Sequence, residues 1–477
     1  MLAVVVLHLS TLNGVLSSDE GGFAMIARWL SAPGDQLYNT MWVDRPPLLI
    51  GVFRIATLLG PHGTRILATG LAVVLVLALA HAARLLAGPR AGVWTAWIAG
   101  ALSSSTMFAA QQLNGEIIAA TAVSLAMLAI VHAVRRGSGP SAFLAGLAAA
   151  SAILIKQDFA DGLVFLAVYC LLSARADRDL RSRLAGLWRW IAAGVVVPVA
   201  GTLIWALGHG GVGALAYAMY GFRLDASQLI GQTGGGAVSG RLHVLVGISL
   251  TSALVPVALC VLIAGARSLR RLEALPVALL AAFVVELVGV IGGGNYWPHY
   301  LIGFIPTMAL AAGILAAQPG LRSFLVKLAG VGTVASAVLA VPLGAVANEG
   351  GSTRVATVSA WLHDSGEPGD TLTTLYSHAS INYLANMRPA YPYAWSLPLR
   401  LRDPGLTLLS DTFAGPQAPT WVLGWDSMTA WGLNQSGNLS HALRVHYRQV
   451  ATVCDKPVWL HVGLTRNLAA TPRMGEC

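Results

Sequence analysis

The stretch ILATGLAVVLVLALA, residues 66–80, contains no charged side chain. With its apolar flanks it approaches the ~20 residues that an α-helix needs to cross the core of a bilayer. Similar runs occupy residues 191–207 and 242–264. Because lipid offers no water to satisfy backbone amides, such segments must be helices rather than open sheet. These runs therefore predict a polytopic α-helical membrane protein.

The composition of the whole chain supports this interpretation. Of its 477 residues, 56% are hydrophobic and only 11% are charged, with a mean hydropathy of +0.67. Soluble domains carry about 25% charged residues, so an ordinary water-soluble protein is excluded. Apolar runs and their charged ends predict about eleven spans. We expect them at residues 1–16, 64–86, 91–110, 116–134, 141–155, 159–174, 187–207, 242–264, 274–292, 299–317 and 325–347.

Basic residues are concentrated in alternate loops between these spans. Five loops together hold 14 Lys and Arg residues, whereas the short loops between them hold only Lys156, Arg223 and Arg241. The positive-inside rule places the basic loops in the cytoplasm. The N-terminus is then inside, and the 17–63 loop and the C-terminal tail are outside. A bias toward Ala, Gly, Val and Arg suggests a GC-rich bacterium, so we expect the bacterial plasma membrane.

The sequence divides into a transmembrane module, residues 1–347, and a C-terminal extracytoplasmic region, residues 348–477, which begins at a Gly-rich junction. Predicted strands at 370–375, 420–424 and 456–462 alternate with helical stretches, which is typical of a small α/β domain. Cys454 and Cys477 both lie in this region, where oxidising conditions permit a disulfide. Spacing alone leaves their pairing open. A second outward loop, 208–241, is rich in glycine and is expected to be mobile.

The first outward loop carries the most informative pattern. Asp19 and Glu20 begin a short segment whose apolar residues recur at helical spacing. A helix lying on the bilayer surface fits this pattern. The motif GDQLY follows at residues 34–38, and DRPP at residues 44–47 leads into a second predicted surface helix, 48–59.

This combination resembles the first extracytoplasmic loop of GT-C glycosyltransferases. The pattern is similar to that of the protein O-mannosyltransferases and lipid A aminoarabinose transferases, a family 39-like group. Further pieces recur in order at residues 112–116 (QLNGE), 152–156 (AILIK) and 298–306, which begins PHYL. The resemblance implies transfer of a sugar from a polyprenyl-phosphate donor to a hydroxyl or amine of a glycan, lipid or protein acceptor. It also implies inverting displacement at the outer face, without a nucleotide.

The resemblance assigns roles to particular residues. Asp19 is the expected general base, with Glu20 and Glu116 as further catalytic residues. Cations stabilise an anionic phosphate leaving group, and the expected ones are Arg45, Arg65, Lys156 and His299. Asp44 and Tyr38 are expected to position substrate. Asp44 and Glu116 also offer oxygen ligands for a divalent metal, although two ligands do not define a site.

One position departs from the family pattern. A lysine usually precedes the two prolines, and this chain has Arg45. The positive charge is kept, but a forked guanidinium is not equivalent to a point ammonium. This difference is consistent with a different donor head-group.

Structural interpretations compete with these assignments. Acids at a helix start cap free amides and complement the helix dipole, and Arg45 or Lys156 could anchor the chain at the lipid headgroups. Two other functions stay open. One is a lipid-carrier flippase or transporter that uses the same charged outward groove without chemistry, and the other is a catalytically silent subunit of an envelope-assembly complex. A transporter predicts broken or charged helices at mid-membrane depth. The ionisable residues gather instead at the outward rim, which favours the enzyme.

Overall fold

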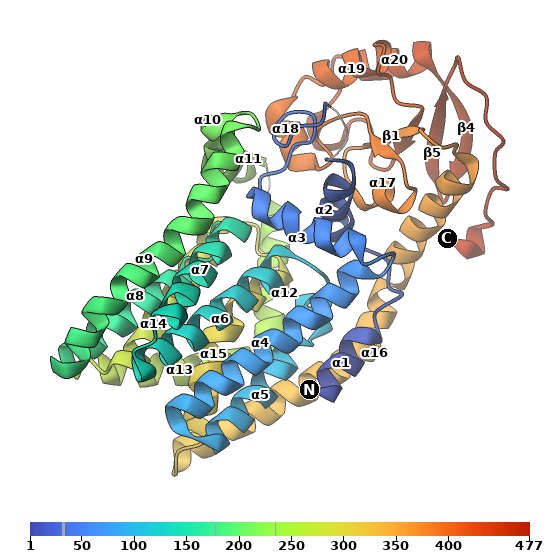
Figure 1. Ribbon diagram of the computed structural model, residues 1–477. Helices are drawn as coiled ribbons and strands as arrows, with labels where there is room; N and C mark the ends of the chain where they lie inside the picture. Colours follow the sequence, from blue (N-terminus) through green and yellow to red (C-terminus); the bar gives the residue numbers. More distant parts are fainter. Residues whose placement is uncertain (31–33, 177, 234) are drawn as a thin grey trace.

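The computed structural model describes residues 1–30, 34–176, 178–233 and 235–477. It shows a helical bundle with a smaller sheet-containing unit at one end (Figure 1). Apolar side chains fill the bundle core, as the sequence predicts. The bundle helices are α4 (Gly63–Ala87), α5 (Pro89–Ser103), α6 (Gly115–Arg136), α7 (Gly139–Ile155), α8 (Asp161–Ala176), α9 (Arg178–Leu207), α12 (Gly235–Thr251), α13 (Leu254–Leu269), α14 (Ala274–Gly293), α15 (Ile305–Ala316) and the first part of α16 (Leu321–Ser365).

Each predicted span coincides with a helix or a helix pair, but the predicted number of spans is not confirmed. Within the described residues, 6 helices are long and apolar enough to cross a membrane, or up to 7 if a bent pair is one span. That pair is α12 and α13, which meet at 76° where the sequence predicts one span over 242–264. Ala253, at the break, has a left-handed φ of 57°. A strained backbone at this point interrupts the continuous helix that composition alone suggests.

The first predicted span is also shorter than expected. Helix α1 (Leu2–Leu9) has 8 residues, which correspond to a length of about 12 Å. The polar residues Ser10 and Thr11 follow it and donate their hydroxyls to carbonyls of the preceding turn. These bonds let the chain leave the helix well before residue 16.

The first outward loop forms two helices, α2 (Ser18–Trp29) and α3 (Pro47–Leu58), which lie between the bundle and the C-terminal unit (Figure 1). Residues 20–27 of α2 are all buried. Phe23 contacts Phe53 of α3 on one side and Trp395 of the C-terminal unit on the other. Protein therefore covers α2 on both sides, and its place on the bilayer surface stays a prediction.

The predicted Gly-rich loop is mostly helical. The described residues from Gly211 to Thr233 form α10 (Gly211–Ala216), a π-helical turn (Tyr217–Gly221) and α11 (Phe222–Thr233). Phe222 is fully buried and packs on Trp42 of the first loop, with 4.5 Å between the ring centroids. The sequence did not predict these helices, because contacts such as that of Phe222 with Trp42 are made between distant segments. The mobility of the segment stays a prediction.

The C-terminal unit contains a mixed five-stranded sheet in the order β2-β1-β3-β5-β4. Its strands are β1 (Thr371–Leu375), β2 (Arg388–Pro389), β3 (Trp421–Gly424), β4 (Tyr447–Val453) and β5 (Lys456–His461). β1 pairs in parallel with β2 and β3, whereas β5 is antiparallel to β3 and β4. The three predicted strands are β1, β3 and β5; the sequence did not predict β2 and β4. The helices are α17 (Ser380–Leu384), α18 (Ser396–Arg402), α19 (Thr407–Ala414) and α20 (Asn438–His446).

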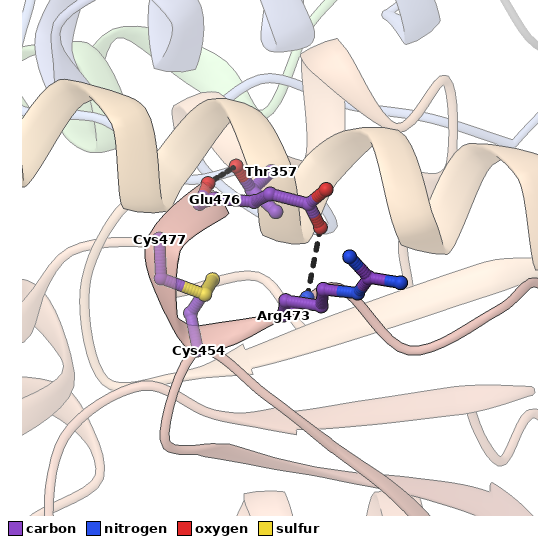
Figure 2. Close-up of a disulfide and its surroundings, with 5 residues drawn as sticks. All are labelled: Thr357, Cys454, Arg473, Glu476 and Cys477. Carbon is purple, nitrogen blue, oxygen red and sulfur yellow. Dashed lines mark hydrogen bonds between the residues drawn. A yellow bond between two sulfur atoms is a disulfide. The ribbon is translucent and has the colours of Figure 1, made fainter.

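A disulfide fastens the C-terminal end of the chain. Cys454 and Cys477, whose pairing the sequence left open, are bonded (Figure 2). Close by, the Thr357 hydroxyl of α16 donates to the backbone carbonyl of Glu476 over 2.8 Å. The last residues are therefore held both to the β4–β5 turn and to α16.

Candidate active site

Asp19 and Glu20, adjacent in the first turn of α2, face different surroundings. Asp19 is partly exposed, and its Oδ1 accepts a hydrogen bond from the indole N–H of Trp395 over 2.9 Å. Glu20 is completely buried and forms an ion pair with Arg65 at 2.9 Å. Its other oxygen accepts the backbone N–H of Leu113. Only Asp19 is therefore open to a substrate.

Arg65 lies at the head of α4 and is 4% exposed. Besides Glu20, its guanidinium donates to the backbone carbonyls of Val15 and Gln111. Arg65 thus connects the start of α4 to the segments before α2 and before α6. The ion pair and these hydrogen bonds hold the first loop in place. The parts of Glu20 in catalysis and of Arg65 in phosphate binding stay predictions.

The DRPP motif forms an ion-pair cluster. The carboxylate of Asp44 contacts Arg45 at 2.9 Å and Arg223 of α11 at 2.5 Å. Burial would raise the pKa of Asp44, but Arg223 and Arg45 outweigh it and hold this pKa below its usual value. The hydroxyl of Tyr38 donates to the backbone carbonyl of Arg45 and fixes the turn. Asp44 therefore orients two cations, one from each of two segments far apart in the sequence.

A second cluster surrounds Lys156, which follows α7. Its ammonium contacts Glu116 at 3.1 Å and Asp158 at 2.6 Å. His299 Nε2 lies 3.5 Å from the same Glu116 carboxylate. The Lys156 ammonium also lies 4.7 Å from the centre of the Tyr300 ring, within cation–π range. The structure thus brings together three of the predicted site residues.

A cavity of about 450 Å³ adjoins both clusters. Its polar wall includes Lys156, Arg223 and Tyr300. An apolar groove of about 270 Å³, between α7, α8, α9 and α10, shares Met219 and Tyr220 with this cavity. The site therefore combines a cationic pocket with an adjoining apolar one.

The carboxylates do not form an evident metal site. In the parts of the chain that the structure describes, no group of three or more His, Cys, Asp or Glu side chains could hold a metal ion. Asp44 already faces two guanidinium groups, and Glu116 faces Lys156 and His299. Carboxylates with such partners stabilise nearby cationic side chains, and a metal shared by Asp44 and Glu116 stays a prediction.

Several residues of the site were not predicted. Arg223 was noted only as a loop charge, although a basic residue in an outward segment is itself a signal for an anion site. Tyr300 lies in the PHYL motif but had no assigned role. Trp395 is 376 positions from Asp19, and no local pattern could connect the two.

The fold resembles those of known membrane glycosyltransferases. No family model and no curated protein sequence matches this chain. ArnT from Cupriavidus metallidurans bound to undecaprenyl phosphate superposes with a TM-score of 0.64 at 14% identity, covering 96% of both chains. An Archaeoglobus fulgidus oligosaccharyltransferase complexed with zinc and sulfate gives a TM-score of 0.53 at 13% identity, covering 94% of this chain and 70% of the other.

A third structure is AglB from the same archaeon, in complex with an inhibitory peptide and a dolichol-phosphate. It gives a TM-score of 0.50 at 12% identity, covering 94% of this chain and 72% of the other. All three structures have the GT-C fold. The chain therefore has this fold, as the sequence predicts.

Proposed function

We propose that this chain is a membrane glycosyltransferase that moves a sugar from a polyprenyl-phosphate donor to an acceptor hydroxyl or amine at the outer face. The observation that carries the proposal is the pairing of the cationic cavity with the apolar groove. A polyprenyl phosphate has the same two parts, an anionic head and an isoprenoid tail. ArnT, which has the same fold, was solved with such a lipid.

In this proposal Lys156 and Arg223 receive the phosphate, because both line the cavity. Glu116, Asp158 and Asp44 hold the two cations at the wall. Arg45 contacts Asp44, and His299 contacts Glu116, so both place a further basic group next to these carboxylates. Fixed charges of this kind stabilise a developing anion better than mobile water does. A divalent metal has no part in the proposal.

The proposed reaction is a single displacement. The acceptor oxygen or nitrogen attacks C1 of the sugar while Asp19 takes its proton. The bond between C1 and the phosphate oxygen breaks, and polyprenyl phosphate leaves with the bonding electrons. Attack opposite to the leaving group inverts the configuration at C1. Asp19 suits the role of base because its carboxylate remains partly exposed, whereas Glu20 is fully buried.

The test is transfer of radiolabelled sugar from polyprenyl-phosphate donors in right-side-out and inverted vesicles. We expect transfer at the outer face, and a loss of about 10²–10⁴-fold in Asp19→Asn, which removes general-base help. Asp411→Asn, an exposed carboxylate of α19, serves as the matched control and should retain activity. Donor binding without transfer in wild type would instead support a lipid-carrier flippase or a silent subunit.

A further inference from the structure

The C-terminal unit reaches the candidate base directly. Trp395, the residue just before α18, donates its indole N–H to Asp19 Oδ1 over 2.9 Å. The same ring packs on Phe23 one turn further along α2, with 5.6 Å between the ring centroids. Two independent contacts therefore fix the indole over the first turn of α2.

Two glycines in α2 leave room for the C-terminal unit to approach the helix this closely. A Cβ atom built on Gly22 would lie 2.4 Å from Cζ2 of Trp395, far inside van der Waals contact. The neighbouring Gly21 approaches Ser380 equally closely, with 2.4 Å between its built Cβ and the Cβ of Ser380. Any larger side chain at these positions would displace the C-terminal unit from α2.

Other contacts hold the two parts together around this point. Arg28, near the end of α2, donates to Asn386 over 3.0 Å, and its guanidinium stacks 3.8 Å from the Tyr383 ring centre. Trp42 donates its backbone N–H to the carbonyl of Pro392. The position of Trp395 is thus set by contacts on both sides of it, and not by its own hydrogen bond alone.

The chemistry of the indole defines what this contact can do. Its N–H is a donor only, so it binds a carboxylate oxygen and offers no acceptor in return. With Oδ1 occupied by Trp395, Oδ2 of Asp19 remains to accept the proton of the attacking group. A bond of this type also fixes the carboxylate rotamer, and orientation of a base is a major part of its effectiveness.

We propose that Trp395 is a positioning residue that orients Asp19 for proton abstraction, so that the C-terminal unit completes the active site. This inference rests on the proposed function, with Asp19 as base. It gives the C-terminal unit a direct part in catalysis, beyond any role in binding the acceptor.

The test compares Trp395→Phe with Trp361→Phe. The first keeps an aromatic ring on α2 but removes the N–H. The second removes an indole bond of similar length, from Trp361 of α16 to the carbonyl of Ala469 over 3.1 Å. We expect Trp395→Phe to lower kcat about tenfold or more, as for loss of a charged hydrogen bond, with the KM for donor unchanged. Trp395→His, which restores an N–H, should recover part of kcat.

Unchanged kcat in Trp395→Phe, or an equal loss in Trp361→Phe, would overturn the proposal. A double variant with Asp19→Asn separates it from the proposed function. If Asp19→Asn keeps only the expected residual activity and adding Trp395→Phe lowers it no further, both proposals stand. If Asp19→Asn is fully active, the assignment of the base fails instead, whatever Trp395 does.

Discussion

Asp44 holds two guanidinium groups at once, Arg45 from its own loop and Arg223 from α11. This arrangement keeps a cation at the cavity wall before any ligand arrives, so that binding requires little reorganisation. Because its pKa is lowered, Asp44 stays charged throughout the pH range in which an ordinary carboxyl group titrates. The pairing is lost only as the pH falls through that lowered value.

We predict that Arg223→Gln weakens donor binding. The change removes one of the two cations on the cavity wall and leaves Asp44 paired with Arg45. The KM for a polyprenyl-phosphate donor should rise about tenfold, as for loss of one charged hydrogen bond, while kcat changes less. Steady-state kinetics in detergent measure both. Arg322→Gln, at an exposed position of α16, should leave KM unchanged, and an unchanged KM in Arg223→Gln would remove Arg223 from the site.

At this scale the sequence identifies residues that stand in local motifs. Asp19, Asp44 and Lys156 could be named because each stands in a short motif that resembles the GT-C pattern. Two of their partners, Arg223 and Trp395, could not be named, since tertiary packing brings them in from distant segments. The sequence also could not predict that Glu20 is buried whereas Asp19 is partly exposed, because the burial of Glu20 depends on its ion pair with Arg65.

Among the elements, β1 is anchored at its start by one carboxylate. Asp370 accepts two hydrogen bonds from Arg466, at 2.6 and 3.0 Å, and one from the indole N–H of Trp421 at 2.8 Å. Burial would raise the pKa of Asp370, but the hydrogen bonds from Arg466, Glu367 and Trp421 lower it below its usual value. This carboxylate connects β1, β3 and the segment that follows β5.

Asp370→Asn should therefore lower the thermal unfolding midpoint at pH 7 by several degrees, the effect expected when bonds to a charged group are lost. Because the folded-state pKa is depressed, the wild-type advantage is present above the unfolded value of about 3.8 and disappears as the pH falls through the lowered one. Thermal melts across pH measure this trend. Asp455→Asn, exposed in the β4–β5 turn, is the control; an equal, pH-independent loss in both variants would contradict the prediction.

Elements with a strong periodic or apolar pattern were predicted well, including most bundle helices and the strands β1, β3 and β5. The failures have physical causes. The break between α12 and α13 depends on a left-handed backbone at Ala253, and the helices of the 211–233 segment depend on contacts such as that of Phe222 with Trp42. Neither cause can be seen in hydropathy, because a hydropathy window averages side-chain polarity and contains no information on backbone conformation or tertiary contacts.

For the whole molecule, α16 is the covalent connection between the bundle and the C-terminal unit. It runs from Leu321 to Ser365 as one helix of 45 residues (Figure 1), a length of about 68 Å. The sequence places a junction at residues 348–352, and the helix continues through it. The division of the chain at residue 348 stays a prediction, but the connection there is a helix rather than a loose linker.

An uninterrupted helix makes the number of residues in the connection matter more than their identity. Each residue of an α-helix turns the chain by about 100° and advances it by about 1.5 Å. Removing one residue between 341 and 351 would therefore swing the C-terminal unit around the helix axis and carry Trp395 away from Asp19. We predict that such a deletion abolishes transfer, whereas replacing residues 348–351 with alanine preserves it; an active deletion variant would contradict this. In evolutionary terms, the length of this segment should stay constant among related proteins, because a change in length would alter how Trp395 faces Asp19.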